Sequence, residues 1–548
     1  MNSMSHEAMQ TQSNTNNLCS LSVKTLLTLF FCAISPSFAA DPGKIECKST
    51  LECDQQLEKM GATRQTKVSE ENSTSPQDAR EDQFYLINEV NKASLVMLTE
   101  EGVVTKSIAK NIAKGVASMA EEATQTTGKR PADYLQIERM LTDRVGQEGS
   151  LIHSGRSRQD IYATIRALKL RNQLLDFHEA LNTLRLGLVA LAEKHVQTII
   201  PAYTNGVQAM PDSYAHYLLG FINALARDSE KIHDAYPRLN QSPMGSAVLA
   251  NSSWPINRER LGYLLGFDQV VVNSFDSSQI IPLDNTLEAV GIVNTTALQL
   301  GMMLQDIHTQ YHQTRPWLLL DEASTYTSSS MPQKRNPGLI MRAREAASAE
   351  LGLGVAIMFR DHNVTSGMTD YKQPTVELNY FPQAMAMLKS THAVFQVLKV
   401  NPVRSLEEVE DDWTTSMELA EGLQSDFKIP FRIGHSFASG IVDYARDKNI
   451  KPKDFPYSQA QLIYQSVSRK MNFEQTTLPI SEQRFRELIS PTFMVKTRLG
   501  TGGPQESEVK KMLESAKTTL VQDQAWLSGK RRTIEERQQE LNQLFGRL

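Results

Sequence analysis

The sequence has 548 residues, of which 40% are hydrophobic and 22% charged, and its formal net charge is -5. This length exceeds what one compact core usually serves, so we expect several domains or one long helical bundle. The composition excludes a disordered or membrane-embedded chain, and the slightly acidic charge, without a basic stripe, argues against a nucleic-acid partner.

Residues 1–39 have the layout of a secretory signal peptide. Lys24 precedes an apolar run over residues 26–34, and small residues around Ala39 offer a cleavage site. An uncleaved anchor or a later start is the alternative, because the polar region before Lys24 is long. We therefore expect an exported, periplasmic protein with no membrane segment after cleavage, or a cytoplasmic protein if the segment is not a working signal.

The four cysteines gather near the N-terminus, at Cys19, Cys32, Cys47 and Cys53. Cleavage would leave Cys47 and Cys53, which could close a short disulfide in an oxidising compartment. Residues 40–82 are polar and lack periodicity, which predicts an N-terminal arm. The body of the chain has no cysteine for a catalytic thiol.

Helical patterns dominate the rest of the chain. Apolar residues from Leu174 to Leu191 alternate spacings of three and four, which predicts one long helix between Asp160 and Ile200. A helix of about forty residues would be roughly 60 Å long. Strand-like alternation is limited to short pieces such as 269–272. Further helices are predicted at about 285–312, 339–359 and 505–548. The fold class is therefore mainly α, and the long apolar helices suggest a bundle completed by other subunits.

A polar segment at residues 327–337 carries the groups most suited to catalysis. It is bounded by prolines and is therefore a loop. A hydroxyl that can lose a proton, with an ammonium and an amide nearby, suits proton abstraction beside a carboxylate, because the enediolate that forms must be stabilised electrostatically. Composition alone leaves an ordinary polar surface turn open. The groups concerned are Ser328, Ser329, Ser330, Lys334 and Asn336.

The order of residues 328–337, SSSMPQKRNP, resembles the signature loop of the fumarase/aspartase superfamily, which includes argininosuccinate lyase, adenylosuccinate lyase and fumarase. Three further segments, at 153–160, 243–250 and 255–260, are similar to argininosuccinate lyase. The resemblance implies an almost all-helical homotetramer around a twenty-helix bundle, in which three subunits build each active site and no metal or cofactor takes part.

The resemblance also implies a division into domains and a substrate. It predicts an N-terminal helical domain over 83–157, a central bundle domain over 158–405 and a C-terminal helical domain over 406–548. The substrate would be a small N-succinyl compound, from which the enzyme releases fumarate by β-elimination.

The resemblance assigns roles residue by residue. Ser328 would remove the Cβ proton of the succinyl group. Lys334 and Asn336 would bind the carboxylate that takes up the negative charge, while Arg158 and Thr204 would clamp the succinyl group. Arginine suits such a clamp because its fork matches a carboxylate. A serine is a poor base, so the loop must close around the substrate.

The departures from the family fall close to these groups. Asn205 stands where the family has a histidine, and it cannot move a proton near neutral pH. Gln159 replaces an asparagine, and Lys372 is retained without the tyrosine and glutamine that precede it in the family. A missing acid/base group typically costs about 10²- to 10⁴-fold in rate. The remaining histidines, including His195, His216 and His308, are interpreted as structural.

The sequence therefore predicts a lyase that acts on argininosuccinate or a related N-succinyl amino compound. The alternative is a catalytically silent tetrameric scaffold or binding protein, which Asn205 favours and the intact Ser328 loop disfavours. No Cys, His and carboxylate residues follow one another at a metal-ligand spacing, and the glycine-rich stretch 500–504 lacks the Lys-Ser/Thr ending of a phosphate-binding loop.

Overall fold

The computed structural model describes residues 80–125, 127–368 and 372–548. The chain divides into two units, 1–71 and 72–548, and only the second contains described residues. The signal peptide and the Cys47 and Cys53 pair lie outside the described residues, so the predictions made for them stay predictions.

The N-terminal helices pack around a hydrophobic core to which Ile87, Val90 and Leu141 belong and to which the beginning of the next helix, α6 (Arg158–Lys194), also contributes. Acidic caps set the starts of two of these helices: Asp82 accepts from the backbone N–H of Tyr85, and Asp133 from that of Gln136. Short helix α8 (Arg258–Leu264) packs against α3. The N-terminal helices are α3 (Gln83–Glu100), α4 (Lys106–Ala123), α5 (Tyr134–Val145) and the 3-10 helix η2 (Gln147–His153).

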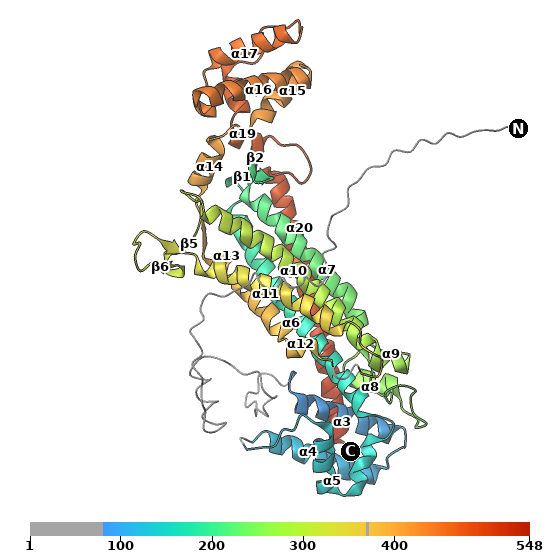
Figure 1. Cartoon of the computed structure of the whole chain (residues 1–548). Coiled ribbons are helices and arrows are strands. Elements are labelled where there is room, and N and C mark those ends of the chain that lie inside the picture. Colours follow the sequence, from blue (N-terminus) through green and yellow to red (C-terminus); the bar gives the residue numbers. More distant parts are fainter. Residues whose placement is uncertain (1–79, 126, 369–371) are drawn as a thin grey trace, which may run out of the picture. The chain divides into compact units, whose positions relative to one another are not determined.

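Long helices form the central bundle, and a second and larger core fills it (Figure 1). Helix α6 packs against α7, α13 and α20, while α10 packs against α7 and α11. The capping box of Ser157 and Asp160 begins α6, which at 37 residues is roughly 55 Å long. The helices are α6 (Arg158–Lys194), α7 (Tyr214–Leu239), α10 (Ile281–Tyr311), α11 (Gly338–Asp361), α13 (Tyr380–Val397) and α20 (Glu506–Gly546).

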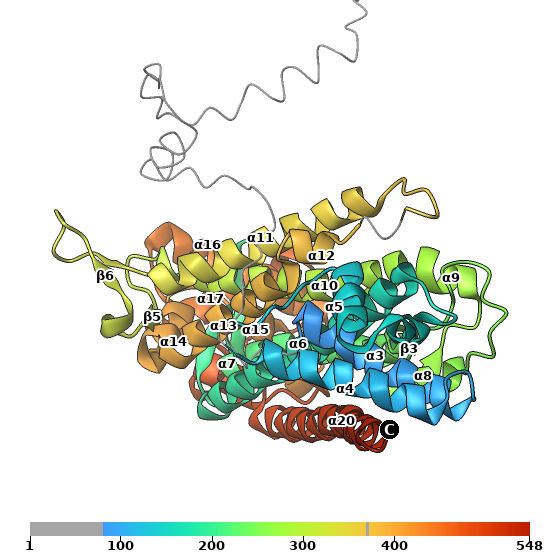
Figure 2. The same ribbon diagram turned by 90° about the horizontal axis from the view of Figure 1, so that it is seen from below.

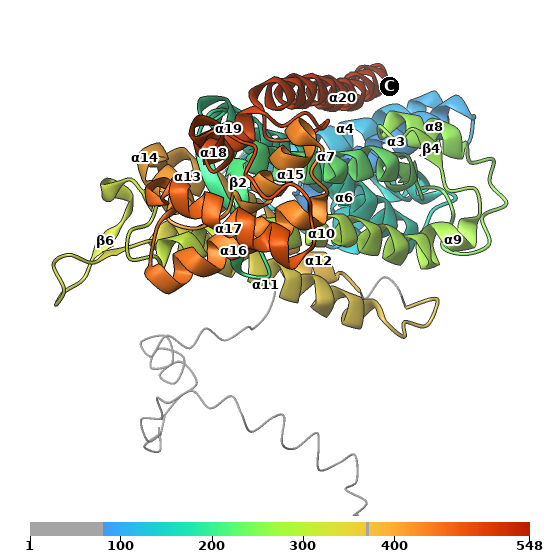
Figure 3. The ribbon, with the colours of Figure 1, turned by 90° about the horizontal axis from the view of Figure 1, so that it is seen from above.

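A third core, containing Phe437, Tyr464 and Phe485, lies among the helices that follow the bundle. Figures 2 and 3 show α15, α16 and α17 in the same part of the molecule, and α16 packs against both α15 and α17. They are α14 (Pro402–Glu410), α15 (Ser416–Phe427), α16 (Phe431–Lys448), α17 (Tyr457–Lys470), α18 (Glu482–Leu488) and α19 (Pro491–Lys496).

Short strands pair two by two in the described part of the chain, and none forms a larger sheet there. Antiparallel pairs join β1 (Ile199–Thr204) with β2 (Val207–Ser213), β5 (Leu318–Leu320) with β8 (Leu398–Val400), and β6 (Tyr326–Thr327) with β7 (Arg335–Asn336). One parallel pair joins β3 (Gln241–Ser242) with β4 (Gln269–Val270). Short connectors complete the elements: α9 (Ser274–Gln279), α12 (Pro374–Glu377), η3 (Glu322–Ser324) and η5 (Pro452–Asp454).

The predicted fold class is confirmed, since the described part of the chain is mainly helical. The four long helices expected from apolar spacing correspond to α6, α10, α11 and α20, and the strand expected at 269–272 is present as β4 over its first two residues. By length and composition α10 could cross a membrane, but half of its most apolar stretch is buried against other helices. That packing is typical of a core helix.

Glu350 makes stability depend on pH, because it is fully buried in α11. Burial raises its pKa to about 8, against a smaller lowering by the Tyr380 hydroxyl. In the unfolded chain a glutamate has a pKa of about 4.3, so the protonated form stabilises the fold and this stabilisation is lost as the pH rises through about 8. We expect Glu350→Gln to raise the free energy of unfolding at pH 9 by about 1–3 kcal/mol.

Thermal unfolding at two pH values checks this expectation. At pH 4, below the unfolded-state pKa of about 4.3, this side chain is largely neutral in the folded and in the unfolded forms of both proteins, so their stabilities should nearly agree. Glu345→Gln, at an exposed position of the same helix, should change neither value. An equal effect of Glu350→Gln at both pH values would contradict a buried, protonated Glu350.

Candidate active site

The loop between β6 and β7 holds Ser328 by its backbone. The two strands pair Tyr326 with Asn336 and Thr327 with Arg335, so the loop is a hairpin. The Oγ atom of Ser328 accepts hydrogen bonds from the backbone N–H groups of Ser330 at 3.4 Å and Met331 at 3.2 Å. N–H donors stabilise an oxyanion more than a hydroxyl, so these contacts favour loss of the proton from Ser328.

Lys334 and Asn336 complete this hairpin. Lys334 is exposed, and its backbone N–H closes a turn with the carbonyl of Met331 at 3.0 Å. The Nδ2 atom of Asn336 donates to the carbonyl of Tyr326 at 3.1 Å, across the base of the hairpin. One hairpin therefore carries a hydroxyl, an ammonium group and an amide, as the sequence predicted for an elimination loop.

Arg158 and Gln159 occupy the first turn of α6. Arg158 is exposed and Gln159 half-buried. The following residue, Asp160, is fully buried and accepts from the backbone of Ser157 at 2.6 Å and from those of Gly245 and Ala247 at 3.2 Å each. These bonds fix the start of α6 against the segment at 243–250, so Asp160 holds Arg158 in place. Sequence reasoning did not single out Asp160 for this role.

Thr204 and Asn205 lie at the turn between β1 and β2. Thr204 pairs with Val207, and Asn205 and Gly206 between them have φ angles of +51° and +76°. Two consecutive residues in the left-handed region form the tight hairpin turn for which Asn-Gly is the preferred pair. Local turn geometry therefore accounts for asparagine at position 205, where its side chain is exposed.

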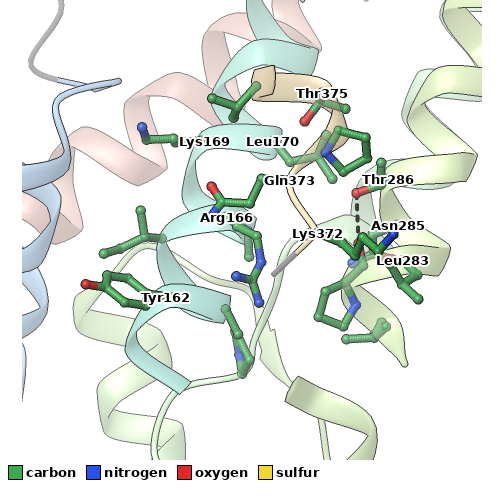
Figure 4. A pocket seen from close by; sticks show the side chains of 18 of the residues that line it. Tyr162, Arg166, Lys169, Leu170, Leu283, Asn285, Thr286, Lys372, Gln373 and Thr375 are labelled. Carbon is green, nitrogen blue, oxygen red and sulfur yellow. Dashed lines mark hydrogen bonds between the residues drawn. The ribbon is translucent and has the colours of Figure 1, made fainter. Parts of the chain in front are cut away.

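Lys372 lines a cavity of about 860 Å³, a volume that includes the part open to solvent (Figure 4). Tyr162 and Arg166 of α6 form one wall, and the N-terminal part of α10, around Asn285, forms another. Arg166 lies two turns of α6 beyond Arg158. The lysine is therefore close to the end of α6 that carries Arg158 and Gln159.

The single chain does not bring all the predicted residues together. Arg158 and Lys372 lie at the N-terminal end of α6, whereas Thr204 follows its C-terminal end, roughly 55 Å away along the helix. Tyr203 and Leu318 line a common cavity, which places β1 and β5 at that second end. The loop that carries Ser328 follows β5 in the chain. The predicted site is thus divided between the two ends of α6.

The histidines interpreted as structural have partners within the chain. His216 has Nδ1 at 2.8 Å from Asp212 and Nε2 at 3.0 Å from the carbonyl of Gly502, and the Asp212 hydrogen bond raises its pKa. The Nδ1 atom of His195 lies 3.0 Å from the Thr198 hydroxyl. His308 lies 3.1 Å from the guanidinium of Arg344. These contacts agree with a structural interpretation.

The structure brings together one group of possible metal ligands that no spacing in the sequence indicated. Possible ligand atoms of His178, His233 and Asp523 lie within 4.8 Å of one another. No sequence spacing could indicate this cluster, because the three residues come from α6, α7 and α20. Arg185 donates to Asp523, so a guanidinium already neutralises this carboxylate. A divalent ion would stand beside that positive charge, which disfavours metal binding there.

The comparison with known proteins places this geometry in a family. The sequence model of the lyase family matches residues 63–347, which is more than half of the chain. The chain belongs to this family of lyases, within the fumarase/aspartase superfamily. Among curated relatives of this lyase, the argininosuccinate lyase of Methanosarcina mazei is 29% identical over 439 residues, which cover 79% of the chain and 86% of the relative.

Further relatives agree on this fold. Argininosuccinate lyase 1 of Shouchella clausii is 26% identical over 84% of the chain and 92% of its own length. The crystal structure of an EDDS lyase in complex with formate is 27% identical, with a TM-score of 0.76 over 85% of this chain and 92% of that one. The class II fumarase of Schistosoma mansoni, 15% identical over 77% of this chain and 93% of its own, has a TM-score of 0.59 and shows the fold alone.

Proposed function

We propose that the protein releases fumarate from an N-substituted aspartate, such as argininosuccinate or a related N-succinyl amino compound, by β-elimination. The observation that carries the proposal is the Ser328 hydroxyl, which accepts from two backbone N–H groups in the hairpin that also presents Lys334. The similarity to argininosuccinate lyases and to an EDDS lyase, one variant of which was solved with bound fumarate, supports the same chemistry.

The proposed reaction uses three groups of the hairpin. The Ser328 alkoxide takes the Cβ proton of the succinyl group, and the electron pair moves into the adjacent carboxylate to give an enediolate. Lys334 and Asn336 stabilise that charge. The enediolate then collapses to fumarate as the C–N bond breaks, and its electron pair leaves with the nitrogen. A guanidinium or ammonium nitrogen that is already protonated leaves as a neutral base, so Asn205 need not supply a proton.

The proposed enzyme is a homotetramer whose sites are shared between subunits. This assembly is supported by the division of the site residues between the two ends of α6, because one chain alone cannot bring both groups of residues to the same substrate. Apolar side chains are also exposed on the outer faces of α10 and α11: Leu298 and Met302 are 60% and 62% exposed, and Met358 and Phe359 57% and 77%. Apolar surface that is gathered on neighbouring helices marks an association face.

We also propose that the protein is exported from the cytoplasm, because residues 1–39 have the layout of a secretory signal peptide. Mass determination of the mature N-terminus checks it. A chain that begins at Ala40 is expected, and an intact N-terminus in the purified secreted fraction would contradict cleavage.

A fumarate assay tests the proposed reaction. The purified protein is offered argininosuccinate and a panel of N-substituted aspartates, and fumarate is followed by its ultraviolet absorbance. We expect fumarate from at least one compound. No fumarate from any of them, with a folded tetramer present, would instead favour the silent scaffold or binding protein, which is supported by Asn205 in the place of the family's histidine.

A further inference from the structure

Asp361 is a buried carboxylate that makes no hydrogen bond in the described part of the chain. It is the last residue of α11 and is only 7% exposed. Neither of its carboxylate oxygens has a hydrogen-bond partner in the described part of the chain. A carboxylate at a helix C-terminus also faces the negative end of the helix dipole. Burial, lack of a partner and the dipole all destabilise it, so a charged group from outside the chain is the expected partner.

The cavity places this carboxylate beside the predicted substrate contacts. Asp361 and Lys372 line the same cavity, together with Arg166 and Lys169 of α6. Arg166 and Lys169 have partners of their own. Neither carboxylate oxygen of Asp361 makes a hydrogen bond with Lys372. The nearest other cation in sequence, Arg360, is paired with Glu377. Asp361 is thus left as an acceptor for a cation that enters the cavity.

We propose that Asp361 binds a protonated amino group on the amine half of the substrate, so that the enzyme prefers N-substituted aspartates whose amine carries a second, cationic nitrogen. This inference rests on the proposed function, since it concerns the half of the substrate that leaves. In the proposed function, Ser328, Lys334 and Asn336 act on the succinyl half. Lys372, which lines the same cavity as Asp361, suits an anionic group of the same amine half, as in a diamino acid.

The charge on Asp361 sets a pH window for this preference. Burial raises the pKa of Asp361 to about 6, while Lys372 and Arg360 lower it and Glu377 raises it. The carboxyl is neutral below this pH. The other charged or titratable side chains that line the cavity are those of Tyr162, Arg166, Lys169 and Lys372, and burial raises the pKa of Tyr162. The preference for a cationic amine should therefore fade as the pH falls through about 6.

Matched substrates test the proposal. N-(ω-aminoalkyl)aspartates of two to five methylene groups are compared with N-alkylaspartates in which a methyl group replaces the terminal ammonium. Fumarate release gives kcat/KM for each. At pH 8 we expect the wild-type protein to prefer the ammonium compound by about 10- to 100-fold at the best spacer length, as a hydrogen bond to a charged group implies.

The variant Asp361→Asn keeps the shape of the side chain and removes its charge. It should reduce the preference for the ammonium compound to within about threefold. Asp443→Asn, at an exposed position of α16, should keep the wild-type preference. Each variant is also checked for assembly by size-exclusion chromatography with light scattering.

The possible failures are distinguishable. No fumarate from any compound would overturn the proposed function and this inference with it. Fumarate release without a preference at any spacer length, or a preference that survives Asp361→Asn, would overturn the role of Asp361 alone. If Asp361→Asn changes the assembly of the subunits but keeps the wild-type substrate preference, the role of Asp361 in substrate binding is also overturned. Asp361 would then be paired with a cation of another subunit.

Discussion

Ser328→Ala is expected to lower kcat/KM for fumarate release by about 10²- to 10⁴-fold, the range typical of a lost catalytic base. The reason lies in the hairpin, where two backbone N–H groups point at the Ser328 oxygen and would stabilise its negative charge. Alanine removes that oxygen and leaves the strands β6 and β7 paired. The binding of fumarate itself should therefore change much less than the rate.

Initial rates over a range of substrate concentrations measure this effect. The loss should appear in kcat, because the alkoxide acts in the transition state and makes little contact in the ground state. Ser329→Ala, the next hydroxyl of the same loop, is the matched control and should stay close to the wild-type rate. Fumarate release that is the same in Ser328→Ala as in the wild type would exclude Ser328 as the base.

The sequence predicted the helical fold well because apolar spacing directly records which face of a helix is buried. Leu174 to Leu191 predicted α6, and all of the leucines in that stripe are buried. The prolines around residues 327–337 likewise predicted a loop, which is the β6–β7 hairpin. These features depend on neighbours in sequence, so a sequence pattern is sufficient to find them.

Other features of the site depend on contacts between distant segments. Asp361 ends a predicted helix, and no pattern along the chain indicates that its carboxylate is buried without a partner beside Lys372. The cluster of His178, His233 and Asp523 comes from three helices. The turn at Asn205 could have been predicted, however, because Asn-Gly between two short strands is the strongest hairpin signal.

Two inactive variants are expected to restore activity to each other when their subunits mix. Arg158 and Thr204 are separated by the length of α6, so one substrate cannot touch Arg158 and the Ser328 hairpin of the same chain. Arg158→Gln and Ser328→Ala tetramers each carry a defect in every site and are both inactive. If each site takes these two segments from different subunits, a mixed tetramer can combine an intact Arg158 with an intact Ser328. Random mixing would leave roughly a quarter of the sites with both segments intact.

Co-expression of the two variants with different affinity tags, and purification over both, yields the mixed tetramers for the fumarate assay. The matched control mixes Ser328→Ala with Lys334→Met. Both changes lie on the same hairpin, so every site of that mixture keeps one defect and should remain inactive. Mixed Arg158→Gln and Ser328→Ala tetramers without activity would mean that a site takes both segments from one chain, against the roughly 55 Å that α6 places between its ends.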